Sequence, residues 1–427
     1  RERTTGNGGG AMWDVVLSTS VTENGYNIVQ CTGVPTLSLV LRIDGIVNVK
    51  QFGAVGDNSN DDTGAAQAAL VVAKDLGTIV YFTGGTYLIT QTLNTTGTGL
   101  LGDGRANTTL KTGGTPAVLH EGGPSSGREF VSLKGLYLLN NGGTGNAVEL
   151  NLSPRHNYLS DLKIYGYYQG AAIDIGDEFW ITDYSDIYLD NCRYGIFFSA
   201  VDTIGNLGGS HTFRGGAIEG CNRAIDGKFK NVAFYGTVIE GNTGLVESYS
   251  NGIAVGGISR LGVGVGPLAI NDGWCEGNAL PAIIVGDGST STNTASAQVT
   301  VAGGRHQSEK LIWVMGNCYS ISLRDLNFGW ATADREAIIW VNSRATSISI
   351  DNIRFNRTYQ SIFDSYTYAY LPNTYMTWNG KQVVWREGAG DTGLVLSSVD
   401  PKLVRLGYTA QDWVFEDFTQ GGLSRTY

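Results

Sequence analysis

Short apolar runs recur along this chain and are separated by turn residues rather than by long polar stretches. Segments such as Leu136-Tyr137-Leu138, Leu162-Lys163-Ile164 and Ile187-Tyr188-Leu189 alternate apolar and polar positions, which is typical of half-buried strands. Runs of this kind return after intervals of 21 to 36 residues. Periods of this length indicate a solenoid, in which each coil contacts only its neighbours. The sequence predicts an all-β chain wound as a parallel coil over residues 47–366.

One repeated motif places glutamates at the same point of successive coils: Ile218-Glu219-Gly220, Ile239-Glu240-Gly241 and Cys275-Glu276-Gly277. Aligned on the residue after each strand, the predicted column reads Tyr165, Asp190, Glu219, Glu240, Glu276 and roughly His306. Parallel strands lie about 4.8 Å apart, so neighbouring carboxyl groups should lie roughly 5 Å apart and next-nearest ones about 9–10 Å apart. Glycosidases use separations of this order, and one crowded carboxyl group should keep its proton and act as general acid.

The motif also has a plainer interpretation as a coil corner, with glycine supplying a positive φ and asparagine stacking its amide along a ladder. Catalysis is favoured because glutamate is not a turn former and because like charges in register repel. The longest intervals also hold inserts, at residues 248–267 and 286–298, of the kind that solenoids place on a binding face. Asp272 is a further candidate carboxylate, whereas Asp190 and Asp226 are expected on the surface.

Basic and aromatic residues near the glutamates are candidates for substrate binding. His211, Arg214, Arg305 and His306 can orient the carboxylates or bind the carboxylate of an acidic sugar, for which the flat guanidinium is suited. Either histidine may instead be an ordinary surface residue. The rings expected to stack on sugars, unless they are simply packed, are Tyr235, Trp274, Tyr249, Trp313 and Trp330.

A second motif opens the coil. It reads Phe52-Gly53-Ala54-Val55-Gly56-Asp57, then Asp61-Asp62-Thr63, and later Gly85-Thr86-Tyr87-Leu88-Ile89. Asp61 or Asp62 is expected to cap a helix over residues 63–76 that ends at Gly77. A helix lying across the first coil covers a sheet edge that would otherwise invite aggregation. Before it, residues 1–46 are predicted to form a small neck with strands at residues 13–17 and 37–43.

These opening residues resemble the start of the pectate-lyase-like, right-handed parallel β-helix superfamily. With the neck, the chain is similar to bacteriophage tailspike depolymerases, particularly podovirus-type tailspikes that attack encapsulated bacteria such as Acinetobacter. The resemblance implies a homotrimer on the virion tail, made in the bacterial cytoplasm and acting on polysaccharide in host adhesion. Because the sequence opens at Arg1 without a methionine, an N-terminal region that attaches to the phage tail is expected to be missing. Residues 367–427 are expected to cap the coil or contact the trimer partners.

The composition of the chain restricts the classes of partner that it is expected to bind. The net charge is −10 with no lysine or arginine cluster, which argues against nucleic acid. No apolar stretch is long enough to span a bilayer, so no membrane contact is expected. Five cysteines without Cys-x-x-Cys spacing predict buried, reduced thiols rather than disulfides. No metal or cofactor is expected.

The sequence leaves three functions open. The first is an endo-acting glycoside hydrolase that cuts bacterial capsular or surface polysaccharide, with Glu219, Glu240 and Glu276 as acid/base candidates and Asp272 in reserve. The second is a polysaccharide lyase on the same coil, in which His211, Arg214, Arg305 and His306 carry the elimination. The third is a non-catalytic adhesin that only binds the glycan.

Overall fold

The computed structural model describes residues 10–113, 116–121, 132–151, 157–176, 182–199, 209–227, 230–242, 258–261, 268–276, 283–285, 297–307, 312–314, 318–328, 339–341, 345–352, 354–355, 375–378, 381–388, 391–396, 406–408 and 411–413. It divides into two compact units, Arg1–Cys192 and Arg193–Tyr427. Each unit has its own stacked, parallel strands.

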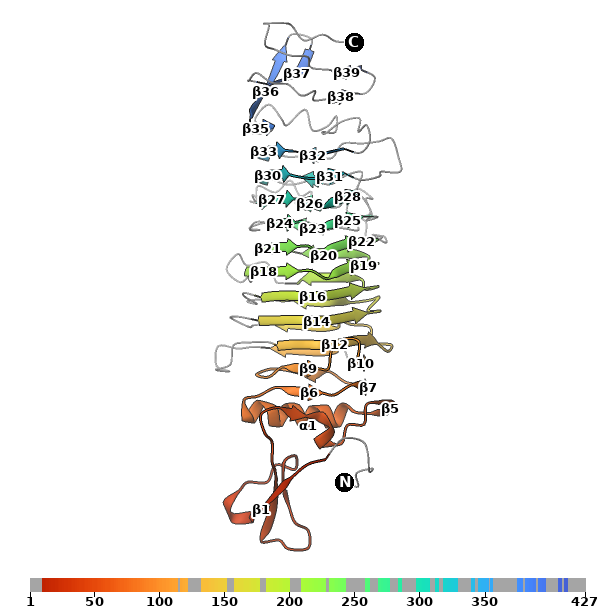
Figure 1. The fold of residues 1–427 in the computed structure, drawn as a ribbon, viewed down its shortest axis with the longest axis vertical. Coiled ribbons are helices and arrows are strands. Elements are labelled where there is room, and N and C mark those ends of the chain that lie inside the picture. Colours follow the sequence, from red (N-terminus) through yellow and green to blue (C-terminus); the bar gives the residue numbers. More distant parts are fainter. Residues whose placement is uncertain are drawn as a thin grey trace. The chain divides into compact units, whose positions relative to one another are not determined.

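Unit 1 begins with a neck of three antiparallel strands, β1 (Trp13–Leu17), β2 (Ile28–Gln30) and β3 (Leu37–Leu41), in the order β1-β3-β2. The two strands expected in this region are therefore confirmed. The neck lies beside the helix α1 at the start of the coil (Figure 1).

The helix α1 (Thr63–Leu76) spans the residues that its sequence signals predict. Asp62 stands at the N-cap, but its carboxylate accepts hydrogen bonds from the backbone of Val55 and Gly56, at 2.6 and 3.0 Å. The neighbouring Asp61 accepts the bond from the first-turn amide of Thr63 instead, at 3.0 Å. Gly77 ends the helix in the left-handed conformation, with φ of 73°. Asp61 therefore caps the start of the helix, and Asp62 binds the backbone of the preceding loop.

The coil of unit 1 stacks its strands in parallel rows. The first row begins as two shorter rows. One is β4 (Val47–Asn48), β6 (Val80–Phe82) and β9 (Leu100–Gly102), and the other is β5 (Asp57–Asp61), β7 (Gly85–Ile89) and β10 (Thr108–Thr112). Both pair with the long strand β12 (Ser132–Asn140), which is followed by β14 (Asn157–Tyr165) and β16 (Thr182–Asp190). A second row consists of β8 (Leu93–Asn94), β11 (Val118–Glu121), β13 (Val148–Asn151) and β15 (Ala171–Ile175).

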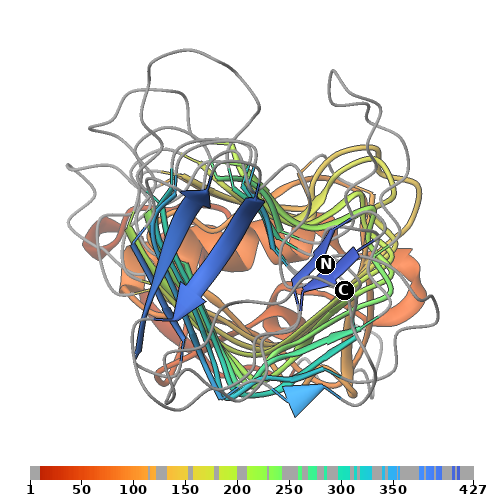
Figure 2. The ribbon, with the colours of Figure 1, turned by 90° about the horizontal axis from the view of Figure 1, so that it is seen from above.

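Unit 2 continues the same plan with three strands in a coil. The first row is β18 (Gly209–Arg214), β21 (Lys230–Tyr235), β24 (Leu268–Asn271), β27 (Ala297–Ala302), β30 (Cys318–Arg324) and β33 (Ala345–Asp351). The second row is β19 (Ala217–Glu219), β22 (Val238–Glu240), β25 (Trp274–Glu276), β28 (Arg305–Gln307), β31 (Asn327–Phe328) and β34 (Arg354–Phe355). The third row is β17 (Tyr194–Phe198), β20 (Arg223–Gly227), β23 (Ile258–Leu261), β26 (Ile283–Val285), β29 (Ile312–Val314) and β32 (Ile339–Val341). Seen along the coil, the strands of each row superpose (Figure 2).

The pairing changes near the end of the chain. The strand β35 (Tyr375–Trp378) is parallel to β33, but it pairs antiparallel with β36 (Lys381–Gly388), which pairs antiparallel with β37 (Asp391–Leu396). The short strands β38 (Leu406–Tyr408) and β39 (Gln411–Trp413) form a separate antiparallel pair. The described part of residues 367–427 therefore departs from the coil rhythm.

Stacked apolar residues fill the coils. In unit 1, Leu138, Ile164 and Leu189 lie in register and are at most 1% exposed. Corners reset the inward–outward alternation, both within long strands and between consecutive ones. They use glycine, aspartate and asparagine at positive φ, including Asp161 within β14 and Asp186 within β16, because these short side chains tolerate the left-handed region best.

The described cysteines are thiols, and most of them are buried. Among the described residues Cys192, Cys221 and Cys275 are buried free thiols, and Cys31 is half-buried. Burial raises the pKa of the Cys275 thiol to about 12. Within the described part of the chain no helix has the length and apolarity that crossing a membrane requires.

Candidate active site

The glutamate column predicted from sequence is present in unit 2. Glu219 on β19 lies in register with Glu240 on β22, and Glu240 lies in register with Glu276 on β25. Strand spacing places the first two about 4.8 Å apart at their backbones and the outer two about 9–10 Å apart. The next position is Gln307 on β28, rather than His306 as predicted. The acidic column therefore ends in an amide.

Alternation along β19 and β22 turns Glu219 and Glu240 outward. The residues before the three glutamates, Ile218, Ile239 and Cys275, are in register and at most 3% exposed. Glu219 and Glu240 are exposed. The Glu240 carboxylate makes no hydrogen bond or ion pair with any described residue, so it is available to a ligand.

The corner interpretation of the motif holds for the residues that follow Glu219 and Glu240. Gly220 and Gly241 have φ of 60° and 62°. The buried Asn242 accepts a hydrogen bond from the Cys221 amide at 3.0 Å and donates one to the Ile218 carbonyl at 3.1 Å. Glycine and asparagine therefore build the turn.

Asp272, the reserve carboxylate, lies at the corner between β24 and β25, with φ of 51°. Its side chain lies against Gly303 of the next coil, where a Cβ would collide with its Oδ1 atom. The structure thus gives Asp272 a turn position, four residues before Glu276, with its carboxylate directed along the stack of coils.

The two histidines lie inside the coil, so the expectation that they face a ligand is wrong. His211 is 1% exposed and His306 is 0% exposed. His211 packs edge-on against Phe198, with ring centroids 5.4 Å apart, and His306 is in register with the buried Cys275. Burial lowers the pKa of His211 to about 3 and that of His306 to about 4. Both imidazoles are therefore neutral near pH 7.

The other four predicted binding residues form two cation–aromatic pairs between neighbouring coils. Arg214 is in register with Tyr235, and its guanidinium lies 5.0 Å from the ring centroid. Arg305 is in register with Trp274, at 4.9 Å. The rings remain 42% and 39% exposed. Each ring therefore offers an open edge or face while its arginine is held in place, an arrangement the sequence did not predict.

Asp226 is buried rather than on the surface as expected. It is fully buried and forms an ion pair with Arg223, three residues earlier on β20. Its other oxygen accepts a hydrogen bond from the Gly227 amide. Tyr249, Trp330, the side chain of Trp313 and most of the two predicted inserts lie outside the described residues.

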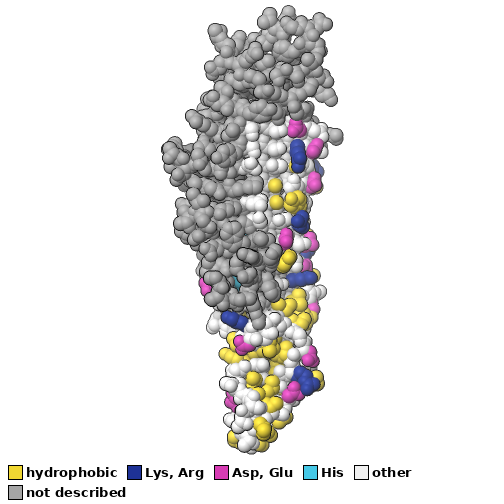
Figure 3. All heavy atoms as spheres, turned by 90° about the vertical axis from the view of Figure 1, so that its left-hand side faces the viewer, with side chains coloured by type: hydrophobic (Ala, Val, Ile, Leu, Met, Phe, Trp, Pro, Cys, Tyr) yellow, Lys and Arg dark blue, Asp and Glu magenta, His cyan; other side chains and the backbone are white. Residues whose placement is uncertain are grey.

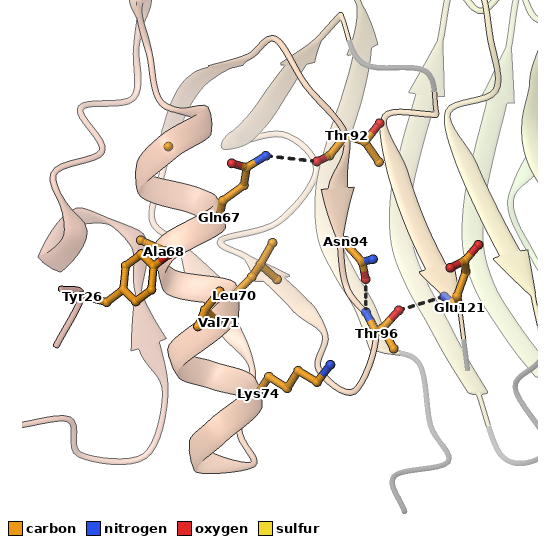
Figure 4. A pocket seen from close by; sticks show the side chains of 11 residues that line it. Tyr26, Gln67, Ala68, Leu70, Val71, Lys74, Thr92, Asn94, Thr96 and Glu121 are labelled. Atoms are coloured by element: carbon orange, nitrogen blue, oxygen red, sulfur yellow. Dashed lines mark hydrogen bonds between the residues drawn. The ribbon is translucent and has the colours of Figure 1, made fainter. Parts of the chain in front are cut away.

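Unit 1 contains a pocket with a volume of about 590 Å³ between α1, the neck and the start of the second strand row. Tyr26, Val71 and Lys74 line one side, and Asn94 and Glu121 line the other (Figure 4). Lys74 and Glu121 give this pocket one charge of each sign. None of the carboxylates predicted to act in acid/base catalysis lines this pocket.

Comparison with known proteins agrees with this architecture. Residues 46–128 match the family model described as rhamnogalacturonase A/epimerase, pectate lyase-like. Full-length tailspike protein 2 from Escherichia coli O157:H7 bacteriophage CAB120 aligns with a TM-score of 0.51 at 13% identity, over 95% of this chain and 56% of that protein. The fold is a right-handed parallel β-helix of the pectate-lyase-like type. The fold resemblance predicted from the opening motif is confirmed.

Two further phage proteins show lower structural similarity. ORF18 of Geobacillus virus E2 aligns with a TM-score of 0.47 at 17% identity, over 94% of this chain and 75% of that one. The tailspike protein of Acinetobacter phage vB_ApiP_P1 has a TM-score of 0.47 at 13% identity, over 87% and 64%. No curated protein sequence matches the chain. The chain spans little more than half of full-length tailspike protein 2.

Proposed function

We propose that this chain is the polysaccharide-degrading part of a phage tailspike, an endo-acting glycoside hydrolase that cuts bacterial capsular or surface polysaccharide. The observation that carries the proposal is the register of Glu219, Glu240 and Glu276 on three adjacent strands. Like charges at this spacing destabilise one another, and the Glu240 carboxylate is exposed, with no hydrogen-bond or ion-pair partner among the described residues. A catalytic role explains why the three glutamates lie so close together: one is a proton donor and another is a nucleophile or base.

Two pairs within the column suit the two hydrolytic mechanisms. Neighbouring carboxylates about 5 Å apart suit retention, in which one attacks the anomeric carbon while the other protonates the departing glycosidic oxygen. The outer pair, Glu219 and Glu276, leaves room for a water. One carboxylate then takes a proton from that water as its oxygen attacks, and the other protonates the leaving oxygen, giving inversion. In both cases water is consumed and one glycosidic bond is broken.

The cation–aromatic pairs extend the proposed site. Tyr235 and Trp274 present exposed rings that can lie against the apolar face of a sugar. Arg214 and Arg305, fixed over these rings, present N–H groups to a sugar carboxylate. The site therefore favours a polysaccharide that contains acidic residues.

The expected assembly is a homotrimer on the virion tail, joined to the phage through an N-terminal region. Exposed apolar side chains of the neck support association between copies, since Met12, Val15 and Leu17 are each 61% exposed. Hydrophobic side chains gather at the lower end of the face drawn in Figure 3. The net charge of −10 supports a glycan partner rather than nucleic acid.

Digestion of purified capsular polysaccharides, followed by mass spectrometry of the products, tests the proposal. A hydrolase gives shortened oligosaccharides that carry one added water for each bond cut. A lyase gives unsaturated ends that absorb in the ultraviolet and add no water. Because His211 and His306 are buried, the lyase alternative depends on Arg214 and Arg305. Unchanged chain length on every capsule tested would leave only the adhesin.

A further inference from the structure

Unit 1 carries an ordered surface that the proposed catalytic chemistry does not use. Tyr137 on β12, Lys163 on β14 and Tyr188 on β16 lie in register on the outward side of the coil. Tyr165, two positions after Lys163, occupies the next outward position on β14. We call these four residues the tyrosine–lysine ladder. Their strands are stacked directly on one another (Figure 1), so the side chains repeat about every 4.8 Å.

Two cations are held against the rings of this ladder. The Lys163 ammonium lies 5.3 Å from the centroid of Tyr137 and 5.9 Å from that of Tyr165. The Arg105 guanidinium lies 4.2 Å from the centroid of Tyr188. Arg105 is itself fixed by an ion pair with Asp161 at 2.6 Å. Cation–π contacts of this kind restrict the rings and the cations together.

The ladder remains open to solvent. Tyr188 is 37% exposed, and Tyr168, on the turn that follows β14, is 62% exposed. Tyr168 is hydrogen-bonded to Tyr165, and this bond raises the pKa of Tyr168. Ring faces and edges that are rigid but not covered are suited to binding an amphipathic ligand.

Lys163 is the cation of the ladder. On β12, β14 and β16 the two outward columns hold this lysine and one carboxylate, Asp190, which is in register with Tyr165. The ion pair of Arg105 with Asp161 adds no net charge. Lys163 forms no ion pair with any described residue, because only rings lie against its ammonium. In a chain of net charge −10, an ammonium group without an ion-pair partner favours an anionic ligand.

We propose that the tyrosine–lysine ladder is a second glycan-binding surface that takes a carboxylated polysaccharide. The rings lie against the apolar faces of successive sugars, and Lys163 pairs with a sugar carboxylate. The inference rests on the proposed function, since a polymer already held at the glutamate column is the expected ligand. A second attachment point raises the retention of a polymer without any new contact at the catalytic carboxylates.

Affinity electrophoresis of the full chain in gels that contain sodium polygalacturonate or neutral dextran tests this inference. Glu240→Gln serves as the background, so that cleavage does not remove the ligand. Lys163→Gln should weaken polygalacturonate binding about tenfold at low salt, since it removes one charge-assisted contact. The double variant Tyr137→Ala/Tyr188→Ala should weaken it at least as much, and added salt should reduce the effect of Lys163→Gln.

Matched controls come from the same strands. Lys134→Gln on β12 removes an exposed lysine, and Tyr158→Ala on β14 removes a ring that is 54% exposed. Both positions precede the corner and lie outside the ladder. Binding that falls equally in Lys134→Gln and Lys163→Gln would overturn the inference, as would equal retardation by dextran. A ladder variant that changes the sedimentation of the protein, but not glycan retardation, would assign the surface to contacts between copies and overturn it too.

The two proposals fail separately. If the unsubstituted chain shortens capsule but polygalacturonate does not retard it, the ladder inference fails and the proposed hydrolase stands. If the ladder binds polygalacturonate but no capsule is shortened, the hydrolase fails and a binding surface remains.

Discussion

The glutamate column of unit 2 and the tyrosine–lysine ladder of unit 1 are built in the same way, but one destabilises the coil and the other stabilises it. Both place side chains in register on adjacent parallel strands, about 4.8 Å apart. In the column, Glu219, Glu240 and Glu276 bring like charges together, which destabilises the coil. In the ladder, Lys163 lies between two aromatic rings, which stabilises it. A solenoid thus accepts either arrangement, and the unfavourable one marks the position where chemistry is expected.

The largest expected effect separates the two surfaces by function. Glu240→Gln keeps the shape of the side chain but removes its charge and its proton transfer, so turnover on capsule should fall by about 10²–10⁴-fold. Reducing-end release measures turnover, and thermal melting measures stability, which should stay nearly constant. Glu121→Gln in unit 1 is the control and should retain full activity. Undiminished turnover in Glu240→Gln would remove this residue from the mechanism.

The next largest effect tests whether the core is packed equally well beneath the column and beneath the ladder. Ile239→Ala, below the column, and Ile164→Ala, below the ladder, each leave a cavity, since the two side chains are 2% and 0% exposed. Each should lower the free energy of unfolding by about 2–5 kcal/mol. Denaturant unfolding measures the loss. A loss below about 1 kcal/mol at either site would show that the coil there is not packed as described.

Acid should destabilise unit 2 more than unit 1. Burial lowers the pKa of His211 to about 3 and of His306 to about 4, whereas unit 1 has one such described residue, His120, with a pKa lowered to about 4. Below the unfolded pKa of about 6.5, the unfolded chain binds protons that the folded chain excludes. Stability is therefore complete above about pH 6.5 and falls as the pH drops toward 4, by on the order of 1 kcal/mol per pH unit for each histidine.

Melting curves between pH 7 and pH 4 check this prediction. In a variant with His211→Phe, which cannot titrate, the slope should be shallower than in the unsubstituted chain. An identical slope would mean that His211 takes up its proton in the folded state.

The smallest expected effect tests whether the ladder stabilises the protein while the column destabilises it. Lys163→Gln removes cation–π contacts at a partly exposed site and should lower stability by about 0.5–1 kcal/mol. Glu240→Gln removes repulsion and should leave stability unchanged or raise it by up to about 0.5 kcal/mol. Melting at low and high salt compares the two, because screening reduces only the ionic part. Shifts of the same sign would contradict the distinction drawn between the two surfaces.

Much of the fold was predictable because its signals are local. The helix over residues 63–76 follows from Asp61, Asp62 and Gly77, and the strand rows follow from the repeated apolar runs. The glutamate column was predictable for the same reason, since one motif recurs after similar corners. The ladder had a signal too: Tyr137, Lys163 and Tyr188 are the central residues of three aligned segments. That alignment predicts the three strands, but by itself it does not show which ring lies against the lysine.

The errors arose where a corner intervenes. Each corner restarts the inward–outward alternation. After Ser210, with φ of 65°, His211 and Phe213 face inward, whereas Thr212 and Arg214 face outward. Alignment on the corner glycines, Gly273 with Gly304, would have paired Glu276 with Gln307 and left His306 beside Cys275. Asp226 was misplaced because its partner Arg223 is recognisable only once β20 is folded into the coil.

The sequence alone determined the repeat, the capping helix and the column of acids, because turn chemistry and apolar periodicity act over a few residues. Only the tertiary structure decided which histidines are buried, which arginine lies over which ring, and which carboxylate builds a corner. Those outcomes depend on register between coils 20 to 36 residues apart. That register is set by the packing of many side chains at once, and no single segment records it.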